Sequence, residues 1–279
     1  MDYQCIVAAT DGTAAARHAV EVAARLASQS GARLRLLSVV PAPASVAAAS
    51  TDPPHAGPFP DLPAGKVETA VAVGLPGVEI ARYAETEHAD LLVLGRPFRS
   101  HASRRLLGDT GDAVARRAAA PCLFVPPVDR FPERVLAALD GTERGLIVMK
   151  TASDYARAAA GRLRAITVEP SMDNEPHHLA SALPTARSER LSQALDRLFF
   201  EDPSLLKVWD RRNQAGDGHL LGVRRGDPVA QILEEVESTT ADVLAVGFHR
   251  GGPPGLIEGR SVGRRLLHSA RCAVLTVPL

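Results

Sequence analysis

Residues 89–98 read ADLLVLGRPF, and residues 241–250 read ADVLAVGFHR. In both stretches an alanine and an aspartate precede a short apolar run that ends at a glycine, Gly95 or Gly247. A short continuous apolar run is typical of a strand covered on both faces, as in a parallel sheet. The two glycines lie 247 − 95 = 152 residues apart. This recurrence suggests that the chain contains two copies of one domain.

The openings of the two copies also match. CIVAATDGT contains Asp11 and RVLAALDGT contains Asp140, so the offset here is 140 − 11 = 129. Further along, VGLPGVEI matches RGDPVAQI, and the offset from Pro76 to Pro228 is 228 − 76 = 152. Two constant offsets indicate a duplicated domain with an insertion of 152 − 129 = 23 residues between Pro170 and Gly226.

We predict a first domain over residues 1–129 and a second over 130–279, with an inserted helix and hairpin segment at about 171–218. The boundary falls in the proline-rich stretch PPVDRFP, residues 126–132. Within the insertion, SERLSQALDRLFF has apolar residues at helical spacing, whereas LLKVWDRR and HLLGVRR flank NQAGDG as in a β-hairpin. The first copy instead has a segment rich in Pro, Ala and Ser at 41–65, which predicts a loop.

Strand and helix patterns alternate along each copy. In the first copy CIVAAT, LRLLSVV, VETAVAV, LLVLG and CLFVP read as strands. An amphipathic helix ends at Gly31, a second begins at Pro76 and a third begins near Thr110. This alternation predicts an α/β fold of two tandem doubly wound domains, each with a five-stranded parallel sheet and helices on both faces.

The composition excludes several classes of protein. Lys plus Arg and Asp plus Glu both number 32, and aromatic residues make up 4%, which argues against a nucleic-acid-binding surface. No apolar run approaches the roughly 20 residues of a membrane-spanning helix. Cys5, Cys122 and Cys272 show no metal-binding spacing, so we expect buried thiols, no metal site and a cytoplasmic protein.

Ligands of open parallel sheets bind at the carboxyl ends of strands, where the strand order reverses. Each copy should place an acid there, Asp11 or Asp140, and a glycine, Gly95 or Gly247. The start of the following helix offers free backbone N–H groups, which suit phosphate, and an acid can hydrogen-bond a ribose hydroxyl. The alternative interpretation is that the acids only cap a turn or helix and the glycines only permit tight turns.

In these features the chain resembles the universal stress protein family in its tandem two-domain form. The resemblance covers nearly the whole chain and rests on VAATDGT and LAALDGT, VGLP and RGDP, ADLLVLG and ADVLAVG, and APCLFVPP and ARCAVLTVP. It implies a fold like that of the adenine nucleotide alpha hydrolases, with strand order 3-2-1-4-5. It also implies pairing through the fifth strands, here CLFVP and AVLTVP, as an intramolecular pseudo-dimer. Many members bind ATP through G-x2-G-x9-G-[S/T] together with the acid after the first strand.

The first copy departs from that motif. Phe98 stands in place of the second glycine after Gly95, and Gly108 is followed by Asp109 in place of a hydroxyl residue. The Asp109 carboxylate can cap its own helix and repels phosphate at close range. We therefore expect the first copy not to bind ATP in the geometry of the family.

The second copy departs differently. Arg250 and Arg260 replace the two later glycines of the motif, while Ser261 retains the hydroxyl. The arginines reduce backbone freedom but add positive charge, which favours phosphate. Gly259 lies beside Arg260 and can restore a loop in a shifted register. We expect an adenine nucleotide, ATP or another, to bind near Asp140, Gly247 and Ser261 if it binds anywhere.

The resemblance, together with these departures from the motif, implies a regulatory or stress-response module with a degraded adenine-nucleotide site. The first alternative is a nucleotide-independent scaffold that binds a protein or a small molecule, and the second is a weak nucleotide hydrolase. The chain contains neither GxSxG nor GxxxxGK[ST], and no nucleophile–base pair can be assigned, so no catalytic residue is named. The protein partner is left open, as is a homodimer of the whole chain.

Overall fold

The computed structural model describes residues 3–40, 67–96, 109–128, 130–169, 186–209, 221–249 and 261–279. Over these residues the first half alternates strands and helices as the sequence pattern predicts. Its strands are β1 (Cys5–Ala9), β2 (Arg33–Val40), β3 (Val67–Val73), β4 (Leu91–Gly95) and β5 (Cys122–Val125). Its helices are α1 (Ala14–Ser30), α2 (Pro76–Thr86) and α3 (Asp109–Arg117).

The second half repeats this alternation and adds two helices from the insertion. Its strands are β6 (Arg134–Leu139), β7 (Arg162–Glu169), β8 (Leu221–Arg225), β9 (Val243–Phe248) and β10 (Ala273–Pro278). Its helices are α4 (Glu143–Ala158), α5 (Ala186–Glu201), α6 (Leu205–Val208), α7 (Pro228–Ser238) and α8 (Val262–Ser269).

The inserted segment is partly as predicted. The helix expected in SERLSQALDRLFF is confirmed as α5, but the hairpin is wrong on its first side, since Leu205–Val208 form α6. The Asp202 carboxylate accepts a hydrogen bond from the backbone N of Ser204 at 3.1 Å, which turns the chain into a helix before a strand can start. Trp209 then makes an isolated parallel bridge to β7. The rest of the predicted hairpin loop, residues 210–220, lies outside the described residues.

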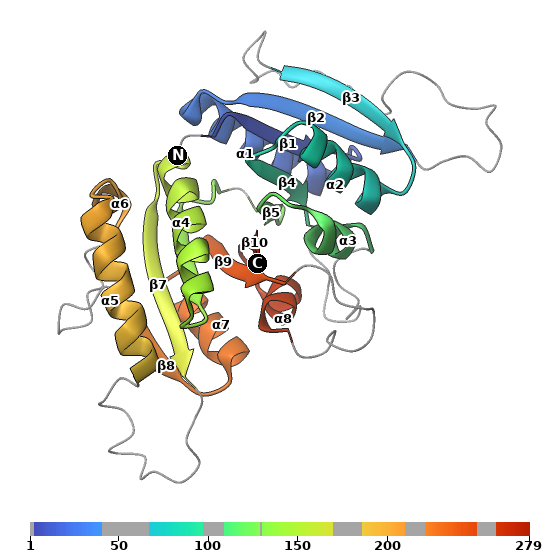
Figure 1. Ribbon diagram of the computed structural model, residues 1–279. Helices are drawn as coiled ribbons and strands as arrows, with labels where there is room; N and C mark the ends of the chain where they lie inside the picture. The colour runs from blue at the N-terminus through green and yellow to red at the C-terminus, as the bar shows by residue number, and fades with distance from the viewer. Residues whose placement is uncertain are drawn as a thin grey trace.

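Both halves belong to one continuous sheet of ten strands, in the order β3-β2-β1-β4-β5-β10-β9-β6-β7-β8. Each half therefore has the order 3-2-1-4-5, which confirms the predicted fold class. Figure 1 shows the blue and green first half meeting the second half at β5 and β10. These two strands pair antiparallel about Leu123 and Leu275, which lie 275 − 123 = 152 residues apart. The pair marks a pseudo-two-fold axis, so the halves are joined as the fifth-strand argument predicts.

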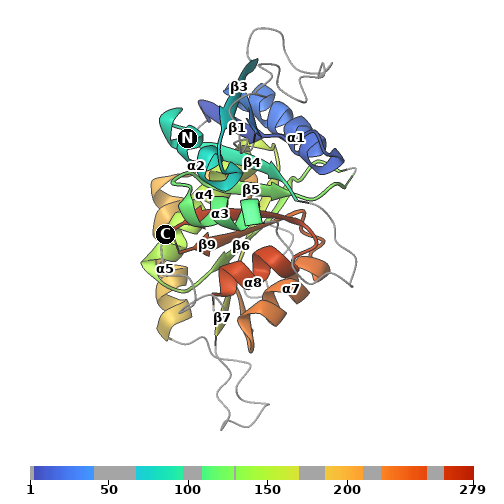
Figure 2. The ribbon, with the colours of Figure 1, turned by 90° about the vertical axis from the view of Figure 1, so that its right-hand side faces the viewer.

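Helices cover both faces of this sheet, and each face has one apolar core that runs through both halves. Ile6 and Ala8 of β1 face the core beneath α1 and α4, while Cys5 and Val7 face the opposite core. That second core contains residues of α2, α3, α7 and α8. Figure 2 shows α3 and α8 near one another on this face. No helix within the described part of the chain is both long and apolar enough to cross a bilayer.

The outer strands of the sheet differ in how they are covered. In the second half, α5 and α6 pack on the α4 side and contribute to the core over β7 and β8, where Leu221 is buried. The matching face of β3 carries Thr69, Val71 and Val73, and Val73 is 52% exposed. The insertion therefore adds a cover to the second half that the described residues of the first half do not supply.

Candidate functional site

The aspartate of the repeated AD stretch fastens the amino-terminal edge of the sheet. In the first half, the Asp90 carboxylate accepts hydrogen bonds from the backbone N atoms of Gln4 at 2.7 Å and Cys5 at 2.9 Å. Charge-assisted bonds of this kind are stronger than neutral ones. Asp90 therefore ties the start of β4 to the start of β1, and its recurrence in the sequence has a structural cause.

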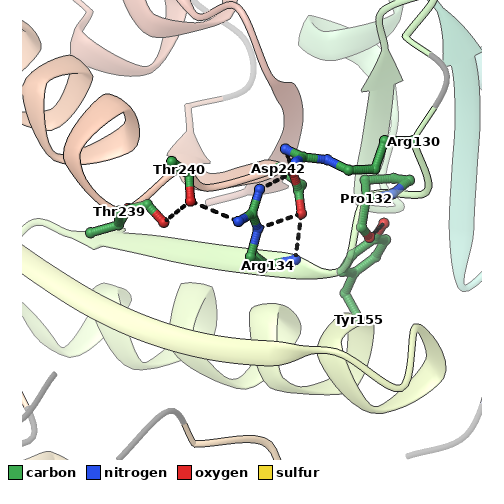
Figure 3. A network of polar contacts seen from close by, with 7 residues as sticks. All are labelled: Arg130, Pro132, Arg134, Tyr155, Thr239, Thr240 and Asp242. Carbon is green, nitrogen blue, oxygen red and sulfur yellow. Dashed lines mark hydrogen bonds and ion pairs between the residues drawn. The ribbon is translucent and has the colours of Figure 1, made fainter. Parts of the chain in front are cut away.

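Asp242 has the same place in the second half and a larger network, drawn in Figure 3. Its carboxylate accepts from the backbone N of Arg134 at 3.2 Å and from the Nε of Arg134 at 2.9 Å, and Arg130 adds an ion pair. The Tyr155 hydroxyl donates to the carbonyl oxygen of Pro132 at 2.7 Å, and burial raises the pKa of Tyr155 well above its usual value. These contacts hold the segment that joins the two halves.

The predicted site residues lie at the opposite, carboxyl edge. Asp11 follows β1, and its Oδ1 accepts from the backbone N of Thr13 at 3.0 Å and from its hydroxyl at 2.7 Å. Asp140 follows β6 and bonds Thr142 in the same way, at 3.0 and 2.7 Å. Thr13 in turn caps α1 by accepting from the backbone N of Ala16 at 3.3 Å. The Oδ1 atom of each aspartate thus stabilises a turn through the threonine two residues later, which explains the DGT triplet in both copies.

The structure brings Asp140, Gly247 and Ser261 to one edge of the sheet. β6 and β9 pair in parallel, so their carboxyl ends adjoin. Ser261 begins α8 as its cap, and a Cβ added at Gly263 in the first turn would lie 2.5 Å from the carbonyl oxygen of Gly247. A Cβ at Gly145 in the first turn of α4 would lie 3.3 Å from Oδ1 of Asp140. Two helix starts therefore converge on the ends of these two strands.

Gly95 and Gly247 have different neighbours. A Cβ at Gly95 would lie 2.5 Å from the backbone carbon of Ala15, because the start of α1 presses on the end of β4. A Cβ at Gly247 would meet the side chain of Leu279, with Cδ1 at 2.5 Å, and that of Val148, with Cγ2 at 3.4 Å. Atoms of the protein itself therefore lie close to both glycines. At Gly95 they are backbone atoms of Ala15, and at Gly247 they belong to the side chain of Leu279.

Several predicted residues lie outside the described part of the chain. These are Gly108, Arg250, Gly259 and Arg260, together with Phe98. Asp109 is the first residue of α3, where the motif has its hydroxyl residue.

Arg96 was missed by sequence reasoning, although it directly follows Gly95. The residue is buried, and its guanidinium crosses to the second half. It donates to the carbonyl oxygens of Leu267 at 2.9 Å, Ala270 at 2.8 Å and Cys272 at 2.6 Å. Burial lowers the pKa of the guanidinium. These carbonyls lie at and beyond the end of α8, where the helix dipole favours a cation.

Asp112 was also missed. Its carboxylate lies 2.8 Å from the Nη2 atom of Arg264 and 3.1 Å from the Nε2 atom of His268, both on α8. Burial alone would raise the pKa of Asp112, but hydrogen bonds from His268 and Arg264 outweigh it and hold the pKa below its usual value. Asp112 and Arg264 are equivalent positions, since 264 − 112 = 152. Equivalent positions of the two copies lie near one another beside the pseudo-two-fold axis. Opposite charges at two such positions are therefore a sequence signal that could have identified the pair of Asp112 and Arg264.

Comparison with known sequences identifies the family. The sequence model of the Universal stress protein family matches residues 2–126 and, a second time, residues 132–278. The chain belongs to the universal stress protein family. No significant match was found among curated proteins.

Solved structures share the fold of this tandem universal stress protein along its whole length. A universal stress protein from Archaeoglobus fulgidus is 16% identical with a TM-score of 0.66, and the alignment covers 98% of each chain. A functionally unknown protein from Pseudomonas aeruginosa is 15% identical with a TM-score of 0.59, covering 99% of this chain and 92% of the other. At this level of identity the likeness concerns the fold.

Proposed function

We propose that this universal stress protein is a cytoplasmic regulatory or stress-response module that binds ATP or another adenine nucleotide in its second half. The observation that carries the proposal is the start of α8 lying against Gly247, at the same edge as Asp140. A helix start offers unpaired N–H groups and the positive end of the dipole, which suit a phosphate. The first turn of α8 contains no acidic residue, so its own charges do not oppose an anion.

The first half is the less favourable half for phosphate. Asp109 begins α3, and a carboxylate at that position repels a phosphate at short range. In the second half, the matching position is Ser261, whose hydroxyl accepts from the backbone N of Arg264 at 3.4 Å. Arg250 and Arg260 supply positive charge in the sequence between Gly247 and α8. The proposal therefore assigns one nucleotide to each chain.

The test is a calorimetric titration of ATP into the full chain and into two matched variants, Asp140→Asn and Asp11→Asn. Asparagine keeps the Oδ1 acceptor that holds each threonine turn, so the change removes charge and leaves the turn. A charge-assisted hydrogen bond contributes about 1.5–3 kcal/mol, so Asp140→Asn should weaken binding by roughly tenfold or more, as should Arg260→Ala. Asp11→Asn should leave the affinity unchanged. Equal effects of the two Asp→Asn changes would refute the assignment to the second half.

The nucleotide-independent scaffold is the second candidate, and Leu279 favours it. Its side chain occupies the space beside Gly247, and its backbone N donates to the carbonyl oxygen of Phe248 at 3.0 Å, which fixes the residue there. Under this hypothesis the sheet edge is filled and the protein acts by binding another protein or a small molecule. Mass spectrometry of molecules released from the denatured, purified protein distinguishes the two, because a co-purified adenine nucleotide supports the first and an empty protein the second.

A further inference from the structure

Helix α8 is held at both ends by side chains of the other half. At its end, Arg96 donates to the carbonyl oxygens of Leu267 and Ala270 at 2.9 and 2.8 Å. Asp112 binds Arg264 in the first turn at 2.8 Å and His268 in the last turn at 3.1 Å. An isolated helix as short as α8 is marginal in water, so its position depends on such contacts.

The polar hold of Arg96 is not repeated at the equivalent position of the second half. The position equivalent to Arg96 is Phe248, since 248 − 96 = 152. Phe248 is buried in the apolar core shared by α2, α3, α7 and α8, and its side chain has no hydrogen-bond donor. It cannot cap the end of α3 as Arg96 caps the end of α8. The first half therefore supports the helix of the second half through bonds that are not returned at this position.

These contacts also flank a single stretch of the first copy. Arg96 directly follows β4 and Asp112 lies in the first turn of α3, so the bonds to α8 come from both sides of the segment where the first copy has its altered motif. Both residues contact α8, and the N-terminal end of this helix, at Ser261, lies against Gly247. The first half, whose motif is less favourable for phosphate, thus contacts the start of α8, where we expect the second half to bind an anion.

We propose that Arg96 and Asp112 are positioning residues of the first half, which hold α8 in register for anion binding by the second half. The ligand in this inference rests on the proposed function, whereas the hold on α8 does not. Donor groups that are fixed before binding lose less freedom when the anion arrives, so a loosened α8 binds it more weakly. Asp112 also fixes the direction of Arg264, a cation in the same turn as the candidate anion site.

The experiment measures amide hydrogen exchange of the unliganded full chain and its affinity for ATP. The variants are Arg96→Phe, which installs the residue that the second half has at this position, and Asp112→Asn. The control is Arg82→Phe, because Arg82 pairs with Glu79 on its own helix, α2. We expect exchange in α8 to rise at least tenfold in both test variants, with α7 unchanged, and the affinity for ATP to fall about tenfold. The control should match the wild type in both measurements.

The outcomes separate this inference from the proposed function. Unchanged exchange in α8 for both variants overturns the positioning role, whatever ATP does. Faster exchange in α8 with no loss of affinity for ATP overturns the link to the site. Faster exchange in α8 in a protein whose wild type binds no ATP supports the hold and refutes the nucleotide proposal. If Arg96→Phe does not fold, Arg96→Lys keeps a cation at the same carbonyls and should give exchange between wild type and Asp112→Asn.

Discussion

The two halves use the residue after the fourth-strand glycine in opposite ways. In the first half it is Arg96, whose guanidinium enters the second half and binds backbone carbonyls. In the second half it is Phe248, which packs in the apolar core. Apart from α5 and α6, the described strands and helices follow one another in the same order in both copies. The difference teaches that one side chain beside the β5–β10 pair, which we call the seam, can connect one half to the helix of the other.

The halves also differ at the outer edges of the sheet. Val73 of β3 is 52% exposed, whereas the matching residue, Arg225 of β8, pairs with the buried Glu169 at 3.4 Å. α5 and α6 supply further cover only in the second half, within the described residues. The seam and the candidate site are thus surrounded by unequal structures, although the strands that form them are equivalent.

The largest expected effect tests whether the seam itself is symmetric. Leu123 and Leu275 are fully buried and face one another across the pseudo-two-fold axis. Truncation of a buried leucine to alanine costs about 2–5 kcal/mol, so Leu123→Ala and Leu275→Ala should each lower the free energy of unfolding by that much and by similar amounts. Urea unfolding measures this. Leu75→Ala is the control, since Leu75 is 73% exposed and should change little. A large inequality between the two seam variants would break the comparison.

A smaller effect should separate the two strand-end glycines. A Cβ at Gly95 would meet the backbone of Ala15 at 2.5 Å, and backbone cannot move aside cheaply. At Gly247 the obstacle is the Cδ1 end of Leu279, which can rotate away. We expect Gly95→Ala to lower the free energy of unfolding by about 3 kcal/mol and Gly247→Ala by less than about 1 kcal/mol. Thermal unfolding of both variants checks the ranking, and the reverse order would contradict the assigned neighbours.

The smallest effect concerns pH and the bonds between α3 and α8. His268 and Arg264 hold the pKa of Asp112 below its usual value against the opposing effect of burial. A carboxyl whose pKa is depressed by folding contributes stability above its unfolded pKa of about 3.9, and this is lost as pH falls through the folded value. Asp112→Asn should therefore destabilise the protein by about 1 kcal/mol at pH 7, and the gap should close below about pH 4. Urea midpoints measured across this range test it; a constant gap would argue against the ion pair.

Much of the fold was predictable because local patterns and global topology agree. VETAVAV coincides with β3, and Gly31 ends α1 with a positive φ of 76°. The pairing of CLFVP with AVLTVP, which the family resemblance implies, is present as the pairing of β5 with β10. The acids after the first strands were singled out correctly as strand-end residues. Their turn bonds to Thr13 and Thr142 were open as an alternative and are present in the structure.

Most of the remainder depended on contacts between residues far apart in the sequence, and one element depended on a local turn. Arg96 binds carbonyls 171, 174 and 176 residues away, and carbonyl acceptors carry no side-chain signature. α6 formed in place of the predicted strand because Asp202 and Ser204 form a local turn. The sequence interpretation gave more weight to the apolar run LLKVW than to this turn. Leu279 beside Gly247 follows from the β9–β10 register, which places the residue after β10 level with the end of β9.

The antiparallel seam joins strands that leave the ribosome at different times. β5 is complete at Val125 and β10 begins at Ala273, which is 273 − 125 = 148 residues later. At roughly 5–20 residues per second, the second strand is made about 7–30 s after the first. During this interval one edge of β5 is paired with β4, whereas the edge that later pairs with β10 is open. An open strand edge is a template for pairing with another chain, so the seam protects β5 only once β10 has been made.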